Sequence, residues 1–162
     1  MLHTTLHLYK QNFKFSSAHF LIFDEKRAEK LHGHNYQVVV EVAPAKGVSF
    51  AEKGFFLDFN LLKKHIKTRL DQWDEMVLLP AKHPEMKISN KAPSLEVRFR
   101  DRFYVFPANE VCLLPITNTS VEQLSQILAE EFSEDFKKWG VARVRVKVEE
   151  TRGQAASTTK IL

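Results

Sequence analysis

The sequence is poor in cysteine and lacks long apolar runs. Cys112 is the only cysteine among the 162 residues, so no disulfide bond can form within the chain. No apolar stretch approaches the length of a membrane-spanning helix, and the N-terminus lacks the apolar core of a signal peptide. Together these absences favour a cytoplasmic protein that is not inserted in a membrane.

The sequence also lacks a basic cluster. The formal net charge is +4, but lysines and arginines are interleaved with acidic residues along the whole chain. This distribution indicates a solvated surface rather than a face that binds nucleic acid, and it allows a mild preference for an anionic substrate. Repeats and low-complexity segments are missing too, and 44% of the residues are hydrophobic. We therefore expect a single domain over residues 1–162.

The segment from Lys30 to Tyr36 carries two histidines, His32 and His34, with only a glycine between them. On a strand, this spacing places both imidazoles on one face. His19 ends a preceding strand-like segment and supplies a third imidazole. Neutral imidazole is a common zinc ligand, and three histidines without a fourth protein ligand leave one position open for water or substrate. Spacing alone is also compatible with a strand that merely carries polar residues.

The pattern of apolar residues predicts an α+β fold. The expected strands and loops are listed in chain order: a strand over 13–19, a loop over 20–31, a strand over 34–42, a loop over 74–94, a hairpin over 95–105 and a strand over 142–150. The first expected helix begins at Asp58 or Asn60 and runs to about Trp73. The second begins at a capping box, either Thr119 with Glu122 or Ser120 with Gln123, and ends near Gly140.

Two neighbouring glutamates end the last predicted strand. Side chains alternate between the two faces of a strand. This alternation places Glu149 on the solvent-exposed face with Lys147, and Glu150 on the apolar face with Val148. A carboxylate on a buried face is costly unless it has a partner. Glu150 is therefore either a functional group or a residue at a strand end that frays into solvent.

Four segments, taken in order, resemble the 6-pyruvoyl-tetrahydropterin synthase family, which also includes 6-carboxytetrahydropterin synthase. The matching segments are Phe15-Ser16-Ser17-Ala18-His19, Leu31-His32-Gly33-His34-Asn35-Tyr36, Leu57-Asp58-Phe59 and Val146-Lys147-Val148-Glu149-Glu150-Thr151. The segment Thr119-Ser120-Val121-Glu122 matches less strictly. The resemblance spans nearly the whole chain, and residues 80–113 look like a loop and hairpin added to the family core.

The resemblance implies the tunnelling fold, or T-fold. In this fold an antiparallel sheet carries two helices on one face, and the sheets of several subunits close into a barrel. The implied assembly is a homo-oligomer, usually a hexamer made of two stacked trimers. Pairing of sheet edges between subunits would leave no edge strand exposed.

The resemblance also implies roles for individual residues. His19, His32 and His34 correspond to the zinc ligands. Glu150 corresponds to the glutamate that binds the pterin ring. Ser120 and Glu122 fall in the segment that lines the pterin pocket, with helix capping as the alternative role.

Two departures from the family pattern concern proton transfer. Ala28 stands where a catalytic cysteine is usual, while Glu29 matches a class of the family that uses glutamate before the Leu-His-Gly-His motif. Asp71 matches the aspartate of an Asp-His relay, but Gln72 replaces the histidine and cannot exchange a proton at neutral pH. Glu29 and Asp71 are thus the predicted catalytic residues. The alternative for Glu29 is that it is only a charged residue in a solvated loop.

The implied activity is that of a zinc-dependent lyase acting on 7,8-dihydroneopterin triphosphate. In the glutamate class the implied outcome is cleavage to 6-hydroxymethyl-7,8-dihydropterin for folate synthesis. One alternative is a 6-pyruvoyl- or 6-carboxytetrahydropterin synthase, the latter belonging to the deazaguanine (queuosine) pathway. A second alternative is a pterin-binding protein without catalytic activity. Beyond Zn²⁺ no cofactor is expected, because the pterin ring itself can accept the electrons.

Overall fold

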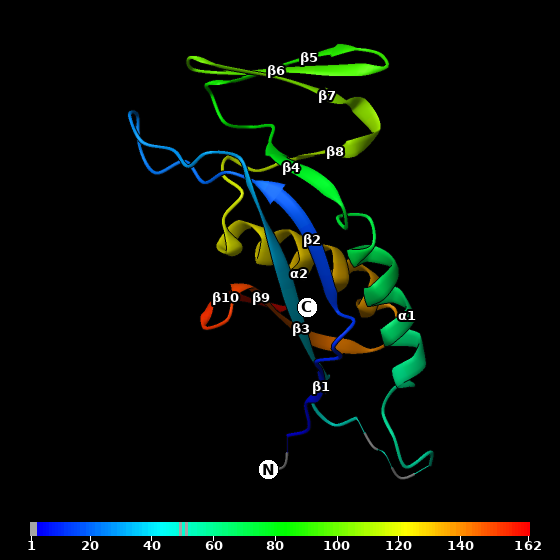
Figure 1. The fold of residues 1–162 in the computed structure, drawn as a ribbon. Coiled ribbons are helices and arrows are strands. Elements are labelled where there is room, and N and C mark those ends of the chain that lie inside the picture. Colours follow the sequence, from blue (N-terminus) through cyan, green and yellow to red (C-terminus); the bar gives the residue numbers. More distant parts are fainter. Residues whose placement is uncertain (1–2, 49, 51) are drawn as a thin grey trace.

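A computed structural model describes residues 3–48, 50 and 52–162 of the chain (Figure 1). Its main element is a seven-stranded sheet with the strand order β10-β9-β3-β2-β4-β8, in which β1 also pairs with β3. The strands of this sheet are β1 (Leu6–Leu8), β2 (Lys14–His19), β3 (His32–Pro44), β4 (Met76–Pro80), β8 (Val111–Leu114), β9 (Val141–Thr151) and β10 (Gln154–Ile161). The strands predicted over 13–19, 34–42 and 142–150 are confirmed as β2, β3 and β9.

Neighbouring strands from β10 to β2 pair antiparallel, whereas β2 pairs with β4, and β4 with β8, in parallel. The prediction of a loop over 74–94 is wrong, because this range contains β4 and a second strand, β5 (Met86–Lys91). β4 was missed because Val77, Leu78 and Leu79 form a continuous apolar run instead of alternating, as is typical of strands in parallel pairing. β10 was missed because its residues are mostly small and polar.

Two helices cover one face of the main sheet, as predicted. They are α1 (Phe59–Leu70) and α2 (Val121–Lys137). One apolar cluster joins helix and strand residues, among them Leu62, Leu128, Tyr36 and Val146. Burial of the apolar face of each helix in this cluster stabilises the helices more than their intrinsic propensities do.

The helix starts correspond to the predicted signals, whereas α1 ends at Leu70, before the predicted end near Trp73. The Asp58 side chain accepts a hydrogen bond from the Asn60 amide at the start of α1. Ser120, rather than Thr119, caps α2 by accepting from the Gln123 amide. Helix α2 ends at Lys137, and Gly140 follows with a φ of +79°, a conformation that glycine adopts without steric cost.

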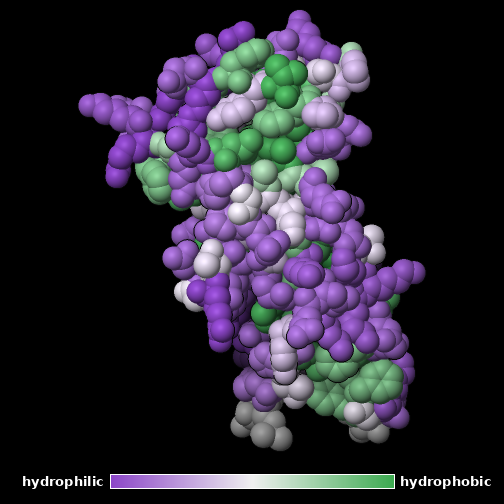
Figure 2. All heavy atoms as spheres, in the orientation of Figure 1, coloured by the Kyte–Doolittle hydropathy of each residue, from purple (hydrophilic) through white to green (hydrophobic). Residues whose placement is uncertain are grey.

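A second, three-stranded antiparallel sheet lies between β4 and β8 in the sequence and projects from one end of the main sheet (Figure 1). Its strands are β5 (Met86–Lys91), β6 (Ser94–Phe99) and β7 (Arg102–Pro107), and a short 3-10 helix, Ala108–Glu110, leads to β8. The predicted hairpin is confirmed as β6 and β7. Hydrophobic side chains gather on the visible face of this sheet and again near the start of α1 (Figure 2).

The second sheet has its own apolar cluster, which it shares with the loop over 20–31. Phe20 and Ile22 of that loop pack with Leu79, Val97 and Phe99. The two sheets therefore meet around a segment that leads directly to the His32-Gly33-His34 motif. Among the described residues, no helix is long and apolar enough to cross a membrane.

Candidate functional site

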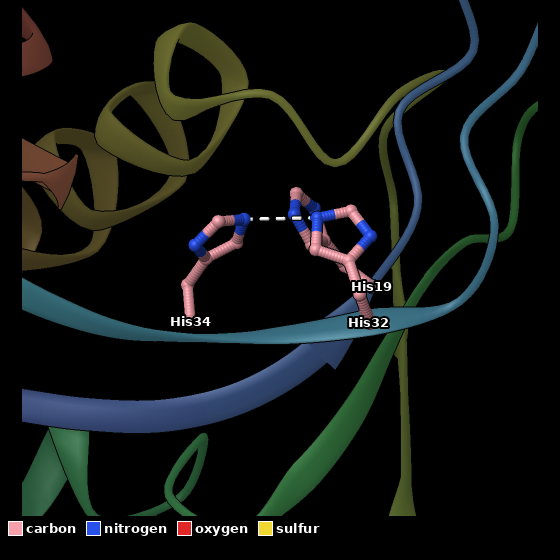
Figure 3. A group of neighbouring side chains, drawn as sticks. All are labelled: His19, His32 and His34. Atoms are coloured by element: carbon pink, nitrogen blue, oxygen red, sulfur yellow. Dashed lines mark hydrogen bonds between the residues drawn. The ribbon is translucent and has the colours of Figure 1, made fainter.

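The three predicted histidines come together where β2 ends and β3 begins (Figure 3). His19 and His32 are direct partners in the antiparallel ladder, and His34 lies two residues further along β3. Each side chain offers one nitrogen, and these three nitrogens lie within 4.8 Å of one another. The cluster could therefore hold a metal ion, as the spacing of the histidines suggested.

Backbone carbonyls orient two of the three rings. His19 Nδ1 lies 3.0 Å from the Thr119 carbonyl oxygen, and His32 Nδ1 lies 2.7 Å from that of Lys30. A carbonyl only accepts hydrogen bonds, so each Nδ1 carries the proton and each Nε2 keeps its lone pair. Backbone contacts of this kind fix the tautomer and the orientation of imidazoles that bind metals.

The electrostatics of the cluster suit a cation. His19 is almost completely buried, and burial lowers its pKa, which keeps the ring neutral. Its Nε2 is buried without a hydrogen bond. The Nε2 atoms of His32 and His34 lie 2.9 Å apart (dashed line in Figure 3). Three converging imidazole nitrogens are a donor set that zinc accepts, so these residues fit a metal.

Glu150, at the end of β9, faces the histidines. Its Oε1 lies 3.1 Å from His19 Nε2 and 3.5 Å from His34 Nε2. The Tyr36 hydroxyl donates to the same oxygen at 3.4 Å. Burial, together with the negative charge of Glu150, raises the pKa of Tyr36, so its hydroxyl stays protonated. Glu149 instead pairs with Lys147 at 2.9 Å, so the two glutamates have different surroundings.

Glu29, in the loop over 20–31, also lies beside the cluster. Its Oε2 is 3.6 Å from His32 Nε2 and accepts a hydrogen bond from the Leu21 amide at 3.0 Å. The side chain is about one-third exposed, so solvent reaches the carboxylate. Two carboxylates therefore lie near the histidine nitrogens, Glu150 from a strand and Glu29 from a loop.

The structure does not bring Asp71 into this group. Asp71 forms the C-terminal cap of α1, and its exposed carboxylate pairs with Lys67 one turn earlier. Gln72 is exposed, and its carbonyl accepts a hydrogen bond from the Cys112 thiol at 3.4 Å. Burial raises the pKa of this thiol, so Cys112 is not an activated nucleophile.

The segment before α2 contacts the cluster through its backbone rather than through the predicted side chains. Ser120 caps the helix, and Glu122 is exposed in its first turn. The contact with His19 comes from the Thr119 carbonyl, for which the sequence carries no signal. Tyr36 was also missed as a site residue, although it shares the strand face of His34 and its parity could have revealed it.

Comparison with known proteins gives concordant results. The chain matches a family model described as 6-pyruvoyl tetrahydropterin synthase over residues 8–160. A Methanocaldococcus jannaschii protein, provisionally named 6-carboxy-5,6,7,8-tetrahydropterin synthase, is 30% identical over 152 residues, covering 92% of this chain and 91% of its own.

Two solved structures have nearly the same fold. The 6-pyruvoyl tetrahydropterin synthase of Plasmodium falciparum superposes with a TM-score of 0.88 at 25% identity over 99% of both chains. The corresponding enzyme of Plasmodium vivax has a TM-score of 0.89 at 24% identity and is covered completely, as is this chain. The latter enzyme has also been solved as a variant in which a glutamate, described as a catalytic residue, is replaced by alanine.

Proposed function

Because the chain belongs to the 6-pyruvoyl tetrahydropterin synthase family, we propose that it is a zinc-dependent enzyme acting on the side chain of 7,8-dihydroneopterin triphosphate. The proposed product is 6-hydroxymethyl-7,8-dihydropterin. The observation that carries this choice is the Glu29 carboxylate beside the histidine cluster, at a site where no cysteine stands.

His19, His32 and His34 would hold the zinc ion through their Nε2 atoms, and no fourth protein ligand is required. When bound, zinc lowers the pKa of a coordinated hydroxyl group and so eases its deprotonation. The protein contributes the fixed rings, which the Thr119 and Lys30 carbonyls hold in place.

Glu150 would bind the pterin ring. The ring presents adjacent N–H donors in a guanidine-like arrangement, and a carboxylate accepts such a pair with two charge-assisted hydrogen bonds. Glu150 lies beside the histidines with one-quarter or less of its side chain exposed, so the ring would lie next to the metal-binding nitrogens. Tyr36 would orient the carboxylate through the hydrogen bond from its hydroxyl.

Glu29 would act as the general base. It would take the proton from the C2′ hydroxyl of the substrate side chain, and the C2′–O bond would become a carbonyl as the C1′–C2′ bond breaks. The electron pair of that bond passes into the pterin ring, and a proton then returns to C1′ to give the hydroxymethyl group. The other fragment leaves as an aldehyde that carries the triphosphate. A positioned general base contributes about 10²–10⁴-fold to such a rate.

A 6-carboxytetrahydropterin synthase is the second candidate, since the Methanocaldococcus relative bears that provisional name. In the family this reaction relies on the cysteine and histidine that Ala28 and Gln72 replace here. The single thiol, Cys112, contacts the Gln72 carbonyl and not the histidines. The side-chain chemistry therefore favours cleavage over the longer rearrangement.

For the assembly, we propose a homo-oligomer in which the main sheets of several subunits join, as in the hexamers that the family resemblance implies. β10 and β8 end the strand order of the main sheet within one chain. Pairing between subunits would satisfy the backbone groups that such edges leave open.

The test is product analysis with zinc-loaded protein and 7,8-dihydroneopterin triphosphate. Formation of 6-hydroxymethyl-7,8-dihydropterin by the native chain, and its loss in Glu29→Gln, supports the proposal. Formation of 6-carboxytetrahydropterin favours the second candidate. Pterin binding without any turnover would indicate a binding protein.

A further inference from the structure

The loop over 20–31 folds back on itself as an irregular hairpin. The Glu29 amide donates to the Leu21 carbonyl at 2.8 Å, while the Leu21 amide donates to the Glu29 carboxylate at 3.0 Å. Ile22 and Ala28 form an isolated antiparallel bridge. This hairpin carries Glu29 to the histidines, so whatever holds the hairpin also sets the position of the carboxylate.

The first half of the hairpin is held by the segment before α2. The Asn118 side chain accepts from the Ile22 amide at 3.1 Å and donates to the Ile22 carbonyl at 2.7 Å. The Thr119 hydroxyl donates to the Phe20 carbonyl at 3.1 Å. These contacts end at Ile22. The half that contains Glu29 pairs with the first half, and its contact outside the hairpin comes from elsewhere.

The second half is held by Arg102, the first residue of β7 in the second sheet. Its guanidinium donates to the Ala28 carbonyl at 3.1 Å and to the Glu29 carbonyl in a shorter contact. The guanidinium also lies over the rings of Phe20 and Phe99, at 5.6 and 5.7 Å from their centroids. It is thus fixed from two sides while it binds two consecutive carbonyls.

We propose that Arg102 is the positioning residue that sets Glu29 against the histidine cluster. This inference rests on the proposed role of Glu29 as base. The planar guanidinium presents several donors in a rigid fork, which suits two neighbouring carbonyls, whereas a lysine offers a single flexible ammonium. Arg102 contacts the backbone of Glu29 and not its carboxylate, so it acts by placing the base.

This proposal gives the second sheet a function in the chemistry. The hairpin shares its apolar cluster with that sheet through Phe20 and Ile22, and Arg102 adds the polar contact next to Glu29 itself. The neighbouring Arg100 donates to the Asp24 carbonyl at 2.6 Å, at the tip of the same hairpin. The turn between β6 and β7 therefore holds the hairpin at its tip, and the first residue of β7 holds it next to Glu29.

A double-mutant cycle between Arg102→Ala and Glu29→Gln tests the proposal. A misplacement of about 1 Å in a reacting group can cost roughly 10²-fold in rate, so Arg102→Ala should lower kcat by about that factor. In the Glu29→Gln background the same substitution should lower kcat by no more than about twofold, since residues that act through one another are not additive. A full further loss in that background would show that Arg102 does not act through Glu29, and would overturn the proposal.

Arg98→Ala is the matched control. Arg98 lies in β6 of the same sheet and is exposed, and its guanidinium stacks 4.0 Å from the centroid of the Phe103 ring. We expect kcat of Arg98→Ala to stay within about twofold of the native value. A loss equal to that of Arg102→Ala would indicate a general disturbance of the sheet and overturn the specific role.

Limited trypsin digestion gives a readout that does not depend on activity. Lys26 and Arg27 are exposed in the hairpin, so release of its second half should speed cleavage there in Arg102→Ala but not in Arg98→Ala. If Glu29→Gln alone leaves turnover unchanged, the proposed function fails, and digestion then decides whether Arg102 holds the hairpin. Equal cleavage rates in Arg102→Ala and Arg98→Ala would overturn that role as well.

Should Arg102→Ala not fold, Arg102→Lys serves in the same double-mutant cycle. Lysine keeps the positive charge and the aliphatic part of the side chain but lacks the forked donors of the guanidinium.

Discussion

The histidine cluster and the Glu29 hairpin face the same point but are built differently. The histidines stand on paired strands, where His19 and His32 are ladder partners and His34 follows at the strand period. Glu29 stands on a loop whose position depends on Arg102, 73 residues later in the sequence. Local backbone geometry thus places the nitrogens that we propose bind zinc, whereas tertiary contacts place the carboxylate that we propose acts as base.

This difference means that metal binding and turnover should be separable. A strand pair buried against two helices tolerates changes in a neighbouring loop, because its backbone hydrogen bonds are satisfied within the sheet. A loop held by a few side-chain contacts opens at a lower free-energy cost than the core. Substitution of a histidine on the strands should therefore abolish both metal binding and turnover, whereas substitution in the hairpin should abolish only turnover.

The largest effect is expected for His34→Ala. The two remaining imidazoles do not hold zinc firmly, so zinc content should fall from one per chain to near zero and turnover should become undetectable. Metal analysis after dialysis measures this, with circular dichroism to check folding. His7→Ala, at a histidine that pairs with Glu41 away from the cluster, is the control and should keep its zinc. Full zinc content in His34→Ala would make the three-ligand assignment wrong.

The next largest effect is expected for Glu29→Gln. This change keeps the shape of the side chain and removes its capacity as a base, so turnover should fall by about 10²–10⁴-fold. Zinc content and pterin affinity should stay close to native, which separates the hairpin from the strands. Glu25→Gln, an exposed residue in the same loop, is the matched control. Unchanged turnover in Glu29→Gln would show that Glu29 is only a loop charge.

The sequence predicted the strand-borne half of the site far better than the loop-borne half. Alternation in the segments 13–19, 34–42 and 142–150 gave the faces of His19, His34 and Glu150, because a strand fixes side-chain direction with a period of two. Helix starts could be predicted because capping depends on adjacent residues, as Asp58 shows. Alternation did not predict β4, because its apolar residues form a continuous run.

The contacts of Glu29 could not be predicted in this way. No periodicity in the sequence connects the hairpin with Arg102, because a guanidinium that binds carbonyls across the fold leaves no local pattern. The family resemblance pointed to Glu29 without indicating what holds it. For Asp71 the resemblance implied a catalytic role, but in the structure its carboxylate pairs with Lys67 and does not reach the histidines.

A moderate effect is expected for Glu150→Gln, which tests the strand-borne half for ligand binding. A hydrogen bond to a charged group contributes about 1.5–3 kcal/mol, so pterin affinity should fall by roughly ten- to a hundredfold. Fluorescence titration with 7,8-dihydroneopterin measures this, and zinc content should remain near native. Glu149→Gln is the control, because Glu149 pairs with Lys147 instead. A larger loss of affinity in Glu149→Gln would place the pterin on the opposite face of β9.

The smallest effect is expected at Ser120, which separates structural support from contact with the substrate. Ser120 caps α2, and the preceding Thr119 carbonyl orients His19. Loss of a serine cap typically costs about 1 kcal/mol, so Ser120→Ala should lower the free energy of unfolding by that amount. Urea unfolding measures this, and KM should hardly change.

Ser120→Asp decides between the two roles of this residue. Aspartate is as good a cap as serine, and its charge is favourable at a helix N-terminus, so the free energy of unfolding should match or exceed the native value. If Ser120 only caps the helix, KM for the pterin substrate stays unchanged in both variants. If its side chain lines the pterin pocket, a new carboxylate there raises KM although stability is restored. That outcome would extend the substrate site from the strands to the start of α2, and support for the site would then no longer divide simply between strands and hairpin.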